Sequence, residues 1–398
     1  MKIALLTETW HPYTNGVITH VDVLRRGLKE QGHEVLVIAA DPTTPHHTLN
    51  AEGILLCPAR RVKQVYDYGL STPFSFQRYG ILRQFQPDVI HIHQEFGIGT
   101  FGWLASRMLR TPLIYTLHTA YDEYLHYLAS PPLIPLVRTI SRSYVKMLAN
   151  ASCVTTGPSQ KAAVYLKERG VSTPFVLIPN SVDRERFDPA AVDPQVRSDI
   201  RKKFKIQPHD IAAIFVGRLG EEKSVSDLLT YWSQAYRFES SLHLLIIGDG
   251  PQRESLTRQA AREDMQHRIH FAGKVLYDDM PAYYSAGDLY VSASTTEMMS
   301  IAMLEAQAMG LPVIQRDDPL NRHQVDVGIN GFLYHDQNSF KEVMDLFKHL
   351  TQEERSAWRH QCAQYVSSHG ASDLASRLLQ IYRQALSTLK EPLLKLEV

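Results

Sequence analysis

Four charged side chains in the second half of the sequence have types and a spacing that could form a binding site. The segment AIFVGRLGEEK places Arg218 and Lys223 after an apolar run, where two cations can bracket a diphosphate. Further along, TTEMMSIAMLEAQ carries Glu297 and Glu305 with seven residues between them. A carboxylate accepts hydrogen bonds from two vicinal hydroxyls, which ribose and hexoses both present. Each residue alone also fits a solvated surface charge, but the four together favour a binding site.

Glycine turns accompany these charges. Gly217 ends one predicted strand, and Gly248 and Gly250 follow the next one in LLIIGDGPQRESL. Glycine lets the backbone approach a phosphate closely, and the N-terminus of a following helix favours an anion. An ordinary tight turn has the same composition. The fingerprint G-x-G-x-x-G is absent after the first strand, which argues against an NAD-dependent dehydrogenase.

Alternating strands and helices must position these groups. Short apolar runs alternate with segments of helical period, first in KIALLTE, EVLVIAA, DVIHIHQ, PLIYTLH and SCVTTG, and again in AAIFVG, LHLLIIG, RIHFAG, DLYVSAS and LPVIQ. This pattern predicts an α/β protein with two doubly wound domains. We expect an N-terminal domain over residues 1–180, a C-terminal domain over residues 181–371, and a helix in residues 372–398 that crosses back to the first domain. Ligands of such sheets bind at the carboxyl ends of the strands, which predicts a site in a cleft between the domains.

Length and composition agree with two ordinary globular domains. The chain has 398 residues, 44% of them hydrophobic and 21% charged. Apolar runs are too short for a membrane span, and the three cysteines show no metal or disulfide spacing. Residues 1–180 carry 17 Lys/Arg and 12 Asp/Glu, a balance of +5, while the remainder has 25 and 30, a balance of −5. This asymmetry is too mild for a nucleic-acid partner.

The order of these motifs resembles the retaining family 4 glycosyltransferases of the GT-B fold. The G-R-(x)4-K turn, IIGDGP, FAGKV and the two glutamates carry the likeness, which covers nearly the whole chain. It implies two Rossmann-like domains that face each other across a cleft. It also implies Arg218 and Lys223 on the donor diphosphate, Glu297 on the transferred sugar and Glu305 on the ribose.

The resemblance adds further donor contacts. It implies that the backbone at Lys274 and Val275 meets the uracil ring of a UDP-sugar, and that Met299, Ser300 and Ile301 line the donor site. The family usually has a glycine where Ser300 stands. No cofactor is implied; Mg²⁺ is compatible with the site, but no visible ligand cluster requires it.

The first half carries the expected acceptor side. In TETWHPYTNGV, Gly16 opens a helix and, by the resemblance, allows a close approach to the donor. His118 ends a predicted strand and is implied beside the donor sugar as a catalytic residue, although a lone histidine is more often structural. The string H-T-x-Y-x-x-Y-x-H-Y, with Tyr121 and Tyr124, resembles the bacterial 1,2-diacylglycerol 3-alpha-glucosyltransferases.

A basic helix points to a membrane. No acidic residue occurs from Tyr124 to Lys167, and Arg138, Arg142 and Lys146 recur every four residues, opposite an apolar face. Basic amphipathic helices lie in anionic membrane interfaces. A helix that packs its apolar face on its own sheet would show the same periodicity.

These residues predict a UDP-glucose-dependent retaining hexosyltransferase. We expect it to glucosylate diacylglycerol, forming alpha-monoglucosyldiacylglycerol for membrane glycolipids, from the cytoplasm as a peripheral protein on the inner face of the membrane. One alternative is a transferase of the same fold that acts on a teichoic acid, a polysaccharide or a small soluble acceptor. Another is a catalytically silent subunit that binds the sugar nucleotide.

Overall fold

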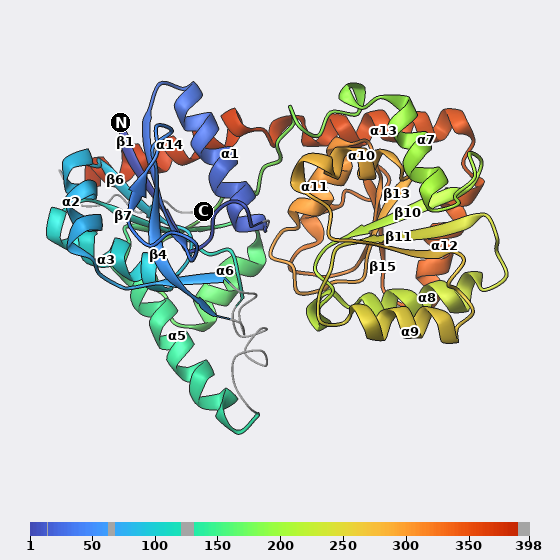
Figure 1. The fold of residues 1–398 in the computed structure, drawn as a ribbon, viewed down its shortest axis with the longest axis horizontal. Coiled ribbons are helices and arrows are strands. Elements are labelled where there is room, and N and C mark those ends of the chain that lie inside the picture. The colour runs from blue at the N-terminus through green and yellow to red at the C-terminus, as the bar shows by residue number, and fades with distance from the viewer. Residues whose placement is uncertain (14, 63–67, 121–130, 389–398) are drawn as a thin grey trace. The chain divides into compact units, whose positions relative to one another are not determined.

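The chain divides into two compact units in its computed structural model (Figure 1). Unit 1 comprises residues 1–181 together with 371–398, and unit 2 comprises residues 182–370. The structure describes residues 1–13, 15–62, 68–120 and 131–388. Each unit is an α/β layer structure with its own sheet and core.

Unit 1 is built on a largely parallel sheet. In its described residues the sheet has nine strands, in the order β3-β4-β2-β1-β6-β7-β8-β9, with β5 paired to β4. Only the pairings of β3 and β5 with β4 are antiparallel among the described strands. The strand order reverses between β1 and β6, which is where ligands of doubly wound sheets bind. The strands are β1 (Lys2–Thr7), β2 (Glu34–Asp41), β3 (Thr48–Leu49), β4 (Ile54–Val62), β5 (Tyr68–Ser71), β6 (Val89–Ile92), β7 (Leu113–Thr116), β8 (Val154–Gly157) and β9 (Phe175–Leu177).

Helices cover this sheet, and the last helix of the chain belongs to this unit. Helix α14 packs so closely on α1 that a Cβ added at Gly27 would lie 2.2 Å from the carbonyl oxygen of Ala371. Apolar side chains of α14, among them Leu378 and Tyr382, share a core cluster with β1 and β2. The helices of unit 1 are α1 (Gly16–Glu30), α2 (Phe76–Phe85), α3 (Gly97–Leu109), η3 (Pro131–Leu133), α5 (Ile134–Ala151), α6 (Gln160–Glu168) and α14 (Ala371–Thr388).

Unit 2 contains a second doubly wound sheet. Its described strands run in the order β12-β11-β10-β13-β14-β15, and all of their pairings are parallel. This is the 3-2-1-4-5-6 order of dinucleotide-binding sheets, with the reversal between β10 and β13. The strands are β10 (Ile211–Val216), β11 (Leu242–Ile247), β12 (Ile269–Gly273), β13 (Leu289–Ser292), β14 (Val313–Arg316) and β15 (Gly331–Tyr334).

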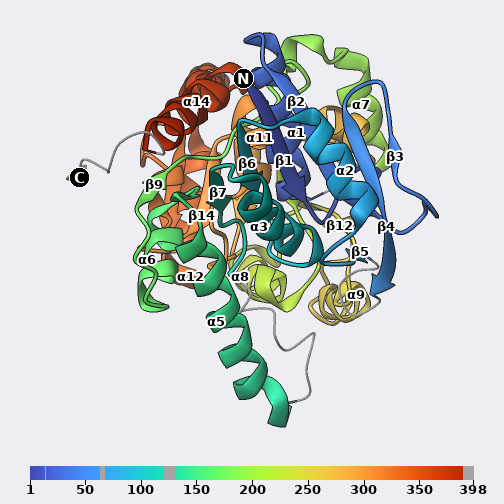
Figure 2. The ribbon, with the colours of Figure 1, turned by 90° about the vertical axis from the view of Figure 1, so that its left-hand side faces the viewer.

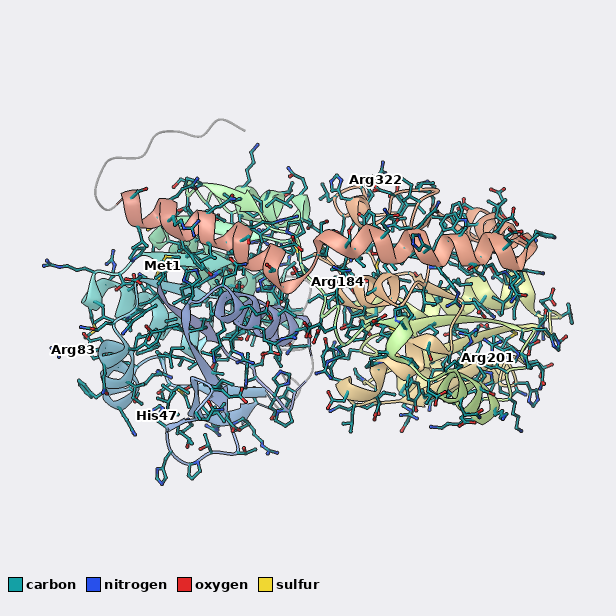
Figure 3. The ribbon with its side chains drawn as sticks, turned by 90° about the horizontal axis from the view of Figure 1, so that it is seen from above. Met1, His47, Arg83, Arg184, Arg201 and Arg322 are labelled. Atoms are coloured by element: carbon teal, nitrogen blue, oxygen red, sulfur yellow. The ribbon has the colours of Figure 1, made fainter. Side chains whose placement is uncertain are left out.

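Helices pack on both faces of this sheet, and the strand residues are shared between two apolar clusters. Asp288, just before β13, accepts hydrogen bonds from Arg197 at 2.8 Å and from the buried Arg201 at 3.2 Å, which ties α7 to the sheet. Arg201 is labelled in Figure 3. The helices are η4 (Pro189–Ala191), α7 (Pro194–Lys203), η5 (Glu221–Lys223), α8 (Val225–Tyr236), α9 (Arg253–Arg262), η6 (Tyr277–Asp279), α10 (Met280–Ser285), α11 (Ile301–Ala308), η7 (Arg322–Gln324), α12 (Gln337–His349), α13 (Gln352–Tyr365) and η8 (Val366–Ser368).

The predicted fold class is confirmed, since both sheets are doubly wound and each of the ten apolar runs forms a strand. The short strands β3, β5, β9 and β15 and the longer β4 were not predicted. Strand β4 begins with apolar residues but continues through Arg60 and Arg61, so its sequence does not read as one apolar run. Across the part of the chain that the structure describes, no helix has the length and apolar character to cross a membrane.

Candidate active site

Three turns meet at the carboxyl ends of β10, β11 and β12 in unit 2. The amide of Gly217 donates to the carbonyl of Ile247 at 3.0 Å, and the amide of Gly248 donates to the carbonyl of Gly273 at 2.9 Å. Gly248 has a φ of +137°, and a Cβ there would lie 1.9 Å from the carbonyl oxygen of Gly217. A side chain at this position is therefore excluded twice, by conformation and by space. The result is a backbone platform at the carboxyl ends of three neighbouring strands, next to the point where the strand order reverses.

Arg218 and Lys223 follow the first of these turns. A guanidinium nitrogen of Arg218 donates to Oε1 of the buried Glu222 at 2.6 Å. Short helix η5 carries Lys223, and its position is fixed from the segment after β13: the hydroxyl of Thr296 donates to the carbonyl of Glu222 at 2.8 Å, and that of Ser294 does so at 3.2 Å. The segment that leads from β13 to Glu297 thus also holds the loop that carries the cations.

Lys223 and Glu297 form an ion pair, so the structure brings together two of the predicted residues that are 74 positions apart. Both side chains are largely buried. The backbone of Glu297 is held separately, because Asn321 donates from Nδ2 to its carbonyl oxygen at 3.0 Å. An ammonium has three donors and a carboxylate has two oxygens, so each partner keeps hydrogen-bonding capacity for a ligand.

Glu305 lies inside unit 2 and not on a helix surface. Glu305 belongs to α11 and is only 6% exposed. The hydroxyl of Tyr284 lies 2.9 Å from its Oε2. Burial raises the pKa of Glu305 to about 8, against hydrogen bonds from Tyr284 and Tyr277 that favour the charged form. A buried carboxyl with so few charge partners is costly for stability, which is typical of a group retained for binding.

The start of α11 is fixed by a pair of amide–backbone hydrogen bonds. Ser300 is the N-cap, and its hydroxyl accepts from the amide of Met303 at 3.3 Å. The amide of Ser300 donates to Oε1 of Gln324 at 2.8 Å, and the Gln324 amide group donates back to the Ser300 carbonyl. With a φ of −75°, Ser300 has no conformational need for the glycine usual in resembling proteins.

In unit 1, the loop after β1 and the start of α1 form the corresponding edge. Gly16 is the first residue of α1, and the N-cap Asn15 accepts from the amide of Ile18 at 3.0 Å. Oε1 of the buried Gln94, which follows β6, accepts from the amides of Glu8 and Thr9 at 2.8 and 3.0 Å. This glutamine joins the carboxyl ends of the two strands at which the sheet order reverses.

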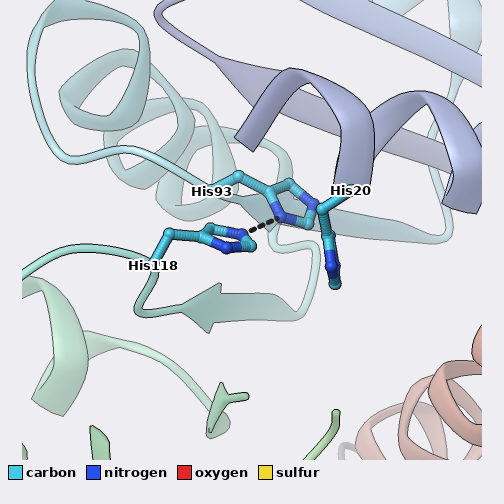
Figure 4. Close-up of side chains that lie close together, drawn as sticks. All are labelled: His20, His93 and His118. Atoms are coloured by element: carbon cyan, nitrogen blue, oxygen red, sulfur yellow. Dashed lines mark hydrogen bonds between the residues drawn. The ribbon is translucent and has the colours of Figure 1, made fainter. Parts of the chain in front are cut away.

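His118 follows β7 and meets two further histidines (Figure 4). Its Nε2 lies 3.1 Å from Nδ1 of His93, and their rings stack with centroids 5.4 Å apart. The ring of His20 on α1 contacts His118 edge-on at 4.7 Å. Burial lowers the pKa of His20 to about 4 and holds the pKa values of His93 and His118 well below the usual range. All three imidazoles are therefore neutral at physiological pH.

Helix α5 extends beyond the sheet and the other helices of unit 1 (Figure 2). Its C-terminal half packs through Val145 and Leu148, but Leu136 and Ile140 are each 60% exposed. Arg138, Arg142 and Lys146 are exposed as well. The expectation that the apolar face could pack on the sheet thus holds only near the end of the helix. The predicted acceptor residues Tyr121 and Tyr124 lie outside the described residues.

Comparison with known proteins assigns the chain to a family. Residues 14–186 match the model "Glycosyltransferase Family 4", and residues 196–366 match "Glycosyl transferases group 1". The chain is a glycosyltransferase of the GT-B fold. It is 29% identical to alpha-monoglucosyldiacylglycerol synthase from Acholeplasma laidlawii over 88% of this chain and 87% of that protein. The synthase of that name from Streptococcus pneumoniae is 28% identical, over 85% and 76%.

Other relatives of this glycosyltransferase have different names. A GDP-mannose-dependent alpha-mannosyltransferase from Corynebacterium glutamicum is 29% identical over 86% of this chain and 79% of that protein. Among solved structures, sucrose-phosphate synthase from Thermosynechococcus elongatus superposes with a TM-score of 0.74 at 18% identity, covering 97% of this chain and 99% of that one. HepE from Anabaena in complex with UDP superposes with a TM-score of 0.72 at 17% identity, over 96% and 100%. These structures support the fold of the glycosyltransferase.

The remaining predicted donor residues of the glycosyltransferase lie around the same edge of unit 2. Lys274 is exposed directly after β12, and Val275 is half-buried, while Ile301 begins α11 behind Ser300. Met299 is half-buried between Glu297 and the helix.

Sequence reasoning missed several residues of these sites. Glu222, Tyr284 and Gln324 hold the predicted donor residues in unit 2, and His20 and His93 surround His118 in unit 1. A usable signal existed for His93, since the string DVIHIHQ puts it at the carboxyl end of a strand. Tyr284 and Gln324 carry no such signal, because they come from helices distant in sequence.

Proposed function

We propose that this glycosyltransferase moves glucose from UDP-glucose to the free hydroxyl of diacylglycerol with retention of the alpha configuration. The observation that carries the donor half is the ion pair of Lys223 with Glu297, in the loops that follow β10 and β13, while the buried Glu305 lies on the next helix. The names of the relatives and the form of helix α5 support the acceptor half.

The two cations suit the diphosphate. A guanidinium carries five N–H donors in a planar fork that matches phosphate oxygens, and Arg218 is held in this loop by its bond to Glu222. Lys223 would exchange part of its contact with Glu297 for a phosphate oxygen. Negative charge grows on the departing UDP as the glycosidic bond breaks, so both cations stabilise the transition state more than the bound substrate.

Glu305 suits the ribose because the hydroxyls of a diol would stabilise its charged form, which burial disfavours by raising the pKa to about 8. In the absence of ligand the carboxyl is largely protonated at neutral pH, and Tyr284 and Tyr277 face it, with Asp183 and Arg186 acting from farther away. A diol donates two hydrogen bonds to the charged form, so binding the ribose favours loss of the proton. The affinity for UDP should therefore increase as the pH rises from about 6 to about 8.

The chemical step we propose takes place on one face of the sugar. The bond between C1 of glucose and the phosphate oxygen breaks, and C1 forms a bond to the oxygen of the diacylglycerol hydroxyl. The hydroxyl proton passes to the departing phosphate oxygen, so charges and atoms balance. Glu297 accepts hydrogen bonds from glucose hydroxyls, and neutral His118 orients the sugar. Neither residue is assigned as a nucleophile.

Helix α5 supports a lipid acceptor. Leu133, Leu136 and Ile140 are exposed, and burying such side chains in the acyl region contributes about 1.5–3 kcal/mol each. Arg138, Arg142 and Lys146 add about 1 kcal/mol each near an anionic surface. Neither contribution anchors the protein irreversibly, which suits peripheral attachment at the inner face of the membrane.

Product analysis tests this function. Vesicles that contain diacylglycerol and an anionic lipid are incubated with UDP-glucose, UDP-galactose or GDP-mannose, and the lipids are examined by mass spectrometry and anomeric NMR. We expect a hexosyl-diacylglycerol with an alpha linkage from UDP-glucose. A product from GDP-mannose alone would favour the mannosyltransferase relatives, and transfer only to soluble acceptors would overturn the lipid assignment. Release of no UDP with any acceptor would favour a silent subunit.

A further inference from the structure

His20, His93 and His118 of unit 1 have an arrangement that sugar transfer does not explain. One ring nitrogen from each of His20, His93 and His118 can be chosen so that all three lie within 4.8 Å of one another. A tetrahedral Zn²⁺ with bonds of about 2.0–2.1 Å separates its nitrogen ligands by about 3.3 Å. The pair His93 Nδ1 and His118 Nε2 is already at 3.1 Å. Small changes of ring orientation would bring the third nitrogen into range.

The hydrogen bond of His20 prepares that residue as a ligand. Its Nδ1 lies 3.1 Å from Oδ1 of Asn180, an oxygen that can only accept, so the proton is on Nδ1 and the lone pair is on Nε2. Metal-binding histidines generally donate their second N–H to an oxygen in this way. Nε2 of His20 is buried and has no hydrogen-bond partner within the described part of the chain.

The neighbouring His91 shows the contrasting case. Its ring stacks on His93 with centroids 4.0 Å apart, but both of its nitrogens have partners. Nδ1 lies 2.7 Å from the hydroxyl of Tyr382, and Nε2 lies 2.6 Å from the hydroxyl of Thr116. The fold therefore gives both nitrogens of His91 a partner, and among the described residues it leaves the ligand nitrogen of His20, Nε2, without one. Buried polar atoms without a hydrogen-bond partner in native proteins commonly indicate a bound ion or a functional role.

We propose that His20, His93 and His118 form a binding site for a transition-metal ion of the Zn²⁺ class. Three neutral imidazoles supply a ligand set that suits Zn²⁺, Co²⁺, Ni²⁺ and Cu²⁺. His118 is partly exposed, which offers a path of entry, and a water molecule would complete the coordination. If His118 orients the donor sugar, as in the proposed function, coordination of the ion engages its imidazole and inhibits glucose transfer. The binding itself does not depend on the proposed function.

Titration of the full chain, without an affinity tag, tests the site. We expect isothermal calorimetry at pH 7.5 to show one equivalent of Zn²⁺ bound with a micromolar or tighter Kd. Co²⁺ should give the intense visible absorption of a tetrahedral site. His20→Asn should weaken binding at least tenfold. Asn180→Ala should weaken it about tenfold, because it removes the group that orients His20 while keeping all three imidazoles.

His270→Asn is the matched control. His270 also lies in a histidine pair, 3.0 Å from Nδ1 of His243, but in unit 2, so its loss should leave Zn²⁺ binding unchanged. Thermal unfolding with and without Zn²⁺ shows that each variant is folded. No stoichiometric binding, or binding that persists in folded His20→Asn and His118→Asn variants, would overturn the proposal. Zn²⁺ binding without any glycosyl transfer would leave the proposal standing and count against the function.

Discussion

The two doubly wound sheets reverse their strand order in the same way but present opposite chemistry there. In unit 2 the edge carries Arg218, Lys223 and Glu297 in ion pairs around a backbone platform. In unit 1 the edge carries no cation in these contacts: neutral imidazoles and the amide of Gln94 lie there, with the buried carboxyls of Glu8 and Glu95 next to Gln94. Topology fixes where a ligand binds, and side chains decide which one. A charged edge suits an anionic nucleotide, and a neutral edge suits sugar and lipid hydroxyls.

Loss of a cation from unit 2 should have the largest effect. Lys223→Ala should lower kcat about 10²–10³-fold, since it removes a donor to the charge that develops on UDP. Lys223→Arg should recover part of the rate. Lys202→Ala, which removes a solvent-exposed lysine of α7, serves as the control and should leave kcat unchanged. An unaltered rate in Lys223→Ala would remove the chemical distinction between the two edges.

The next largest effect is expected on membrane attachment, when the basic face of α5 is neutralised. The triple substitution Arg138→Gln, Arg142→Gln and Lys146→Gln removes about 3 kcal/mol of attraction at low salt, which corresponds to about 10²-fold in vesicle binding. Flotation with anionic vesicles measures the change, and salt should reduce the difference.

The apolar face of α5 is tested separately. Leu136→Ser with Ile140→Ser should reduce vesicle binding more than tenfold and should do so in high salt as well. Phe238→Ser is matched to it, because Phe238 is an apolar residue of unit 2 that is 94% exposed. If Phe238→Ser reduced vesicle binding as much as the double substitution in α5, membrane attachment would not be a property of unit 1.

Glu305→Gln should alter the dependence of stability on pH. Burial raises the pKa of Glu305 from 4.5 to about 8, so between these values the folded state holds more protons than the unfolded state. The free energy of unfolding therefore falls as pH rises through this window. The Tm of the variant should equal that of the parent below pH 4.5 and be higher above pH 8. Each kcal/mol of difference in the free energy of unfolding corresponds to about 2–4 °C in Tm. Parallel Tm curves would contradict the raised pKa.

The smallest effect is expected at Ser300. Replacing this N-cap by alanine should cost about 1 kcal/mol of stability, and replacing it by glycine only a few tenths, since φ is already accessible to both. Urea unfolding measures the difference. A large loss in Ser300→Gly would show that the serine hydroxyl has a role beyond the cap.

The strands and the charged residues of the donor edge were predictable because both depend on local patterns. Apolar runs define the strands, and turns that end in Gly217 and Gly248 place the charges after them. The environment of those charges was not predictable. Glu305 sits inside an apolar helix, yet its partner Tyr284 comes from α10, and His118 meets His93 from a neighbouring strand. Such partners are set by the packing of elements distant in sequence, which periodicity does not encode.

Amide hydrogen exchange on the full chain tests most directly whether unit 2 binds the nucleotide and unit 1 binds the membrane. We predict that UDP slows exchange at the backbone around Gly217–Lys223, Gly248 and Ser294–Ile301 in unit 2, and that anionic vesicles slow it in α5 of unit 1. Addition of UDP should leave α5 unchanged. Protection by UDP confined to unit 1, or protection by vesicles confined to unit 2, would contradict the assignment of the nucleotide to the charged edge and of the membrane to α5.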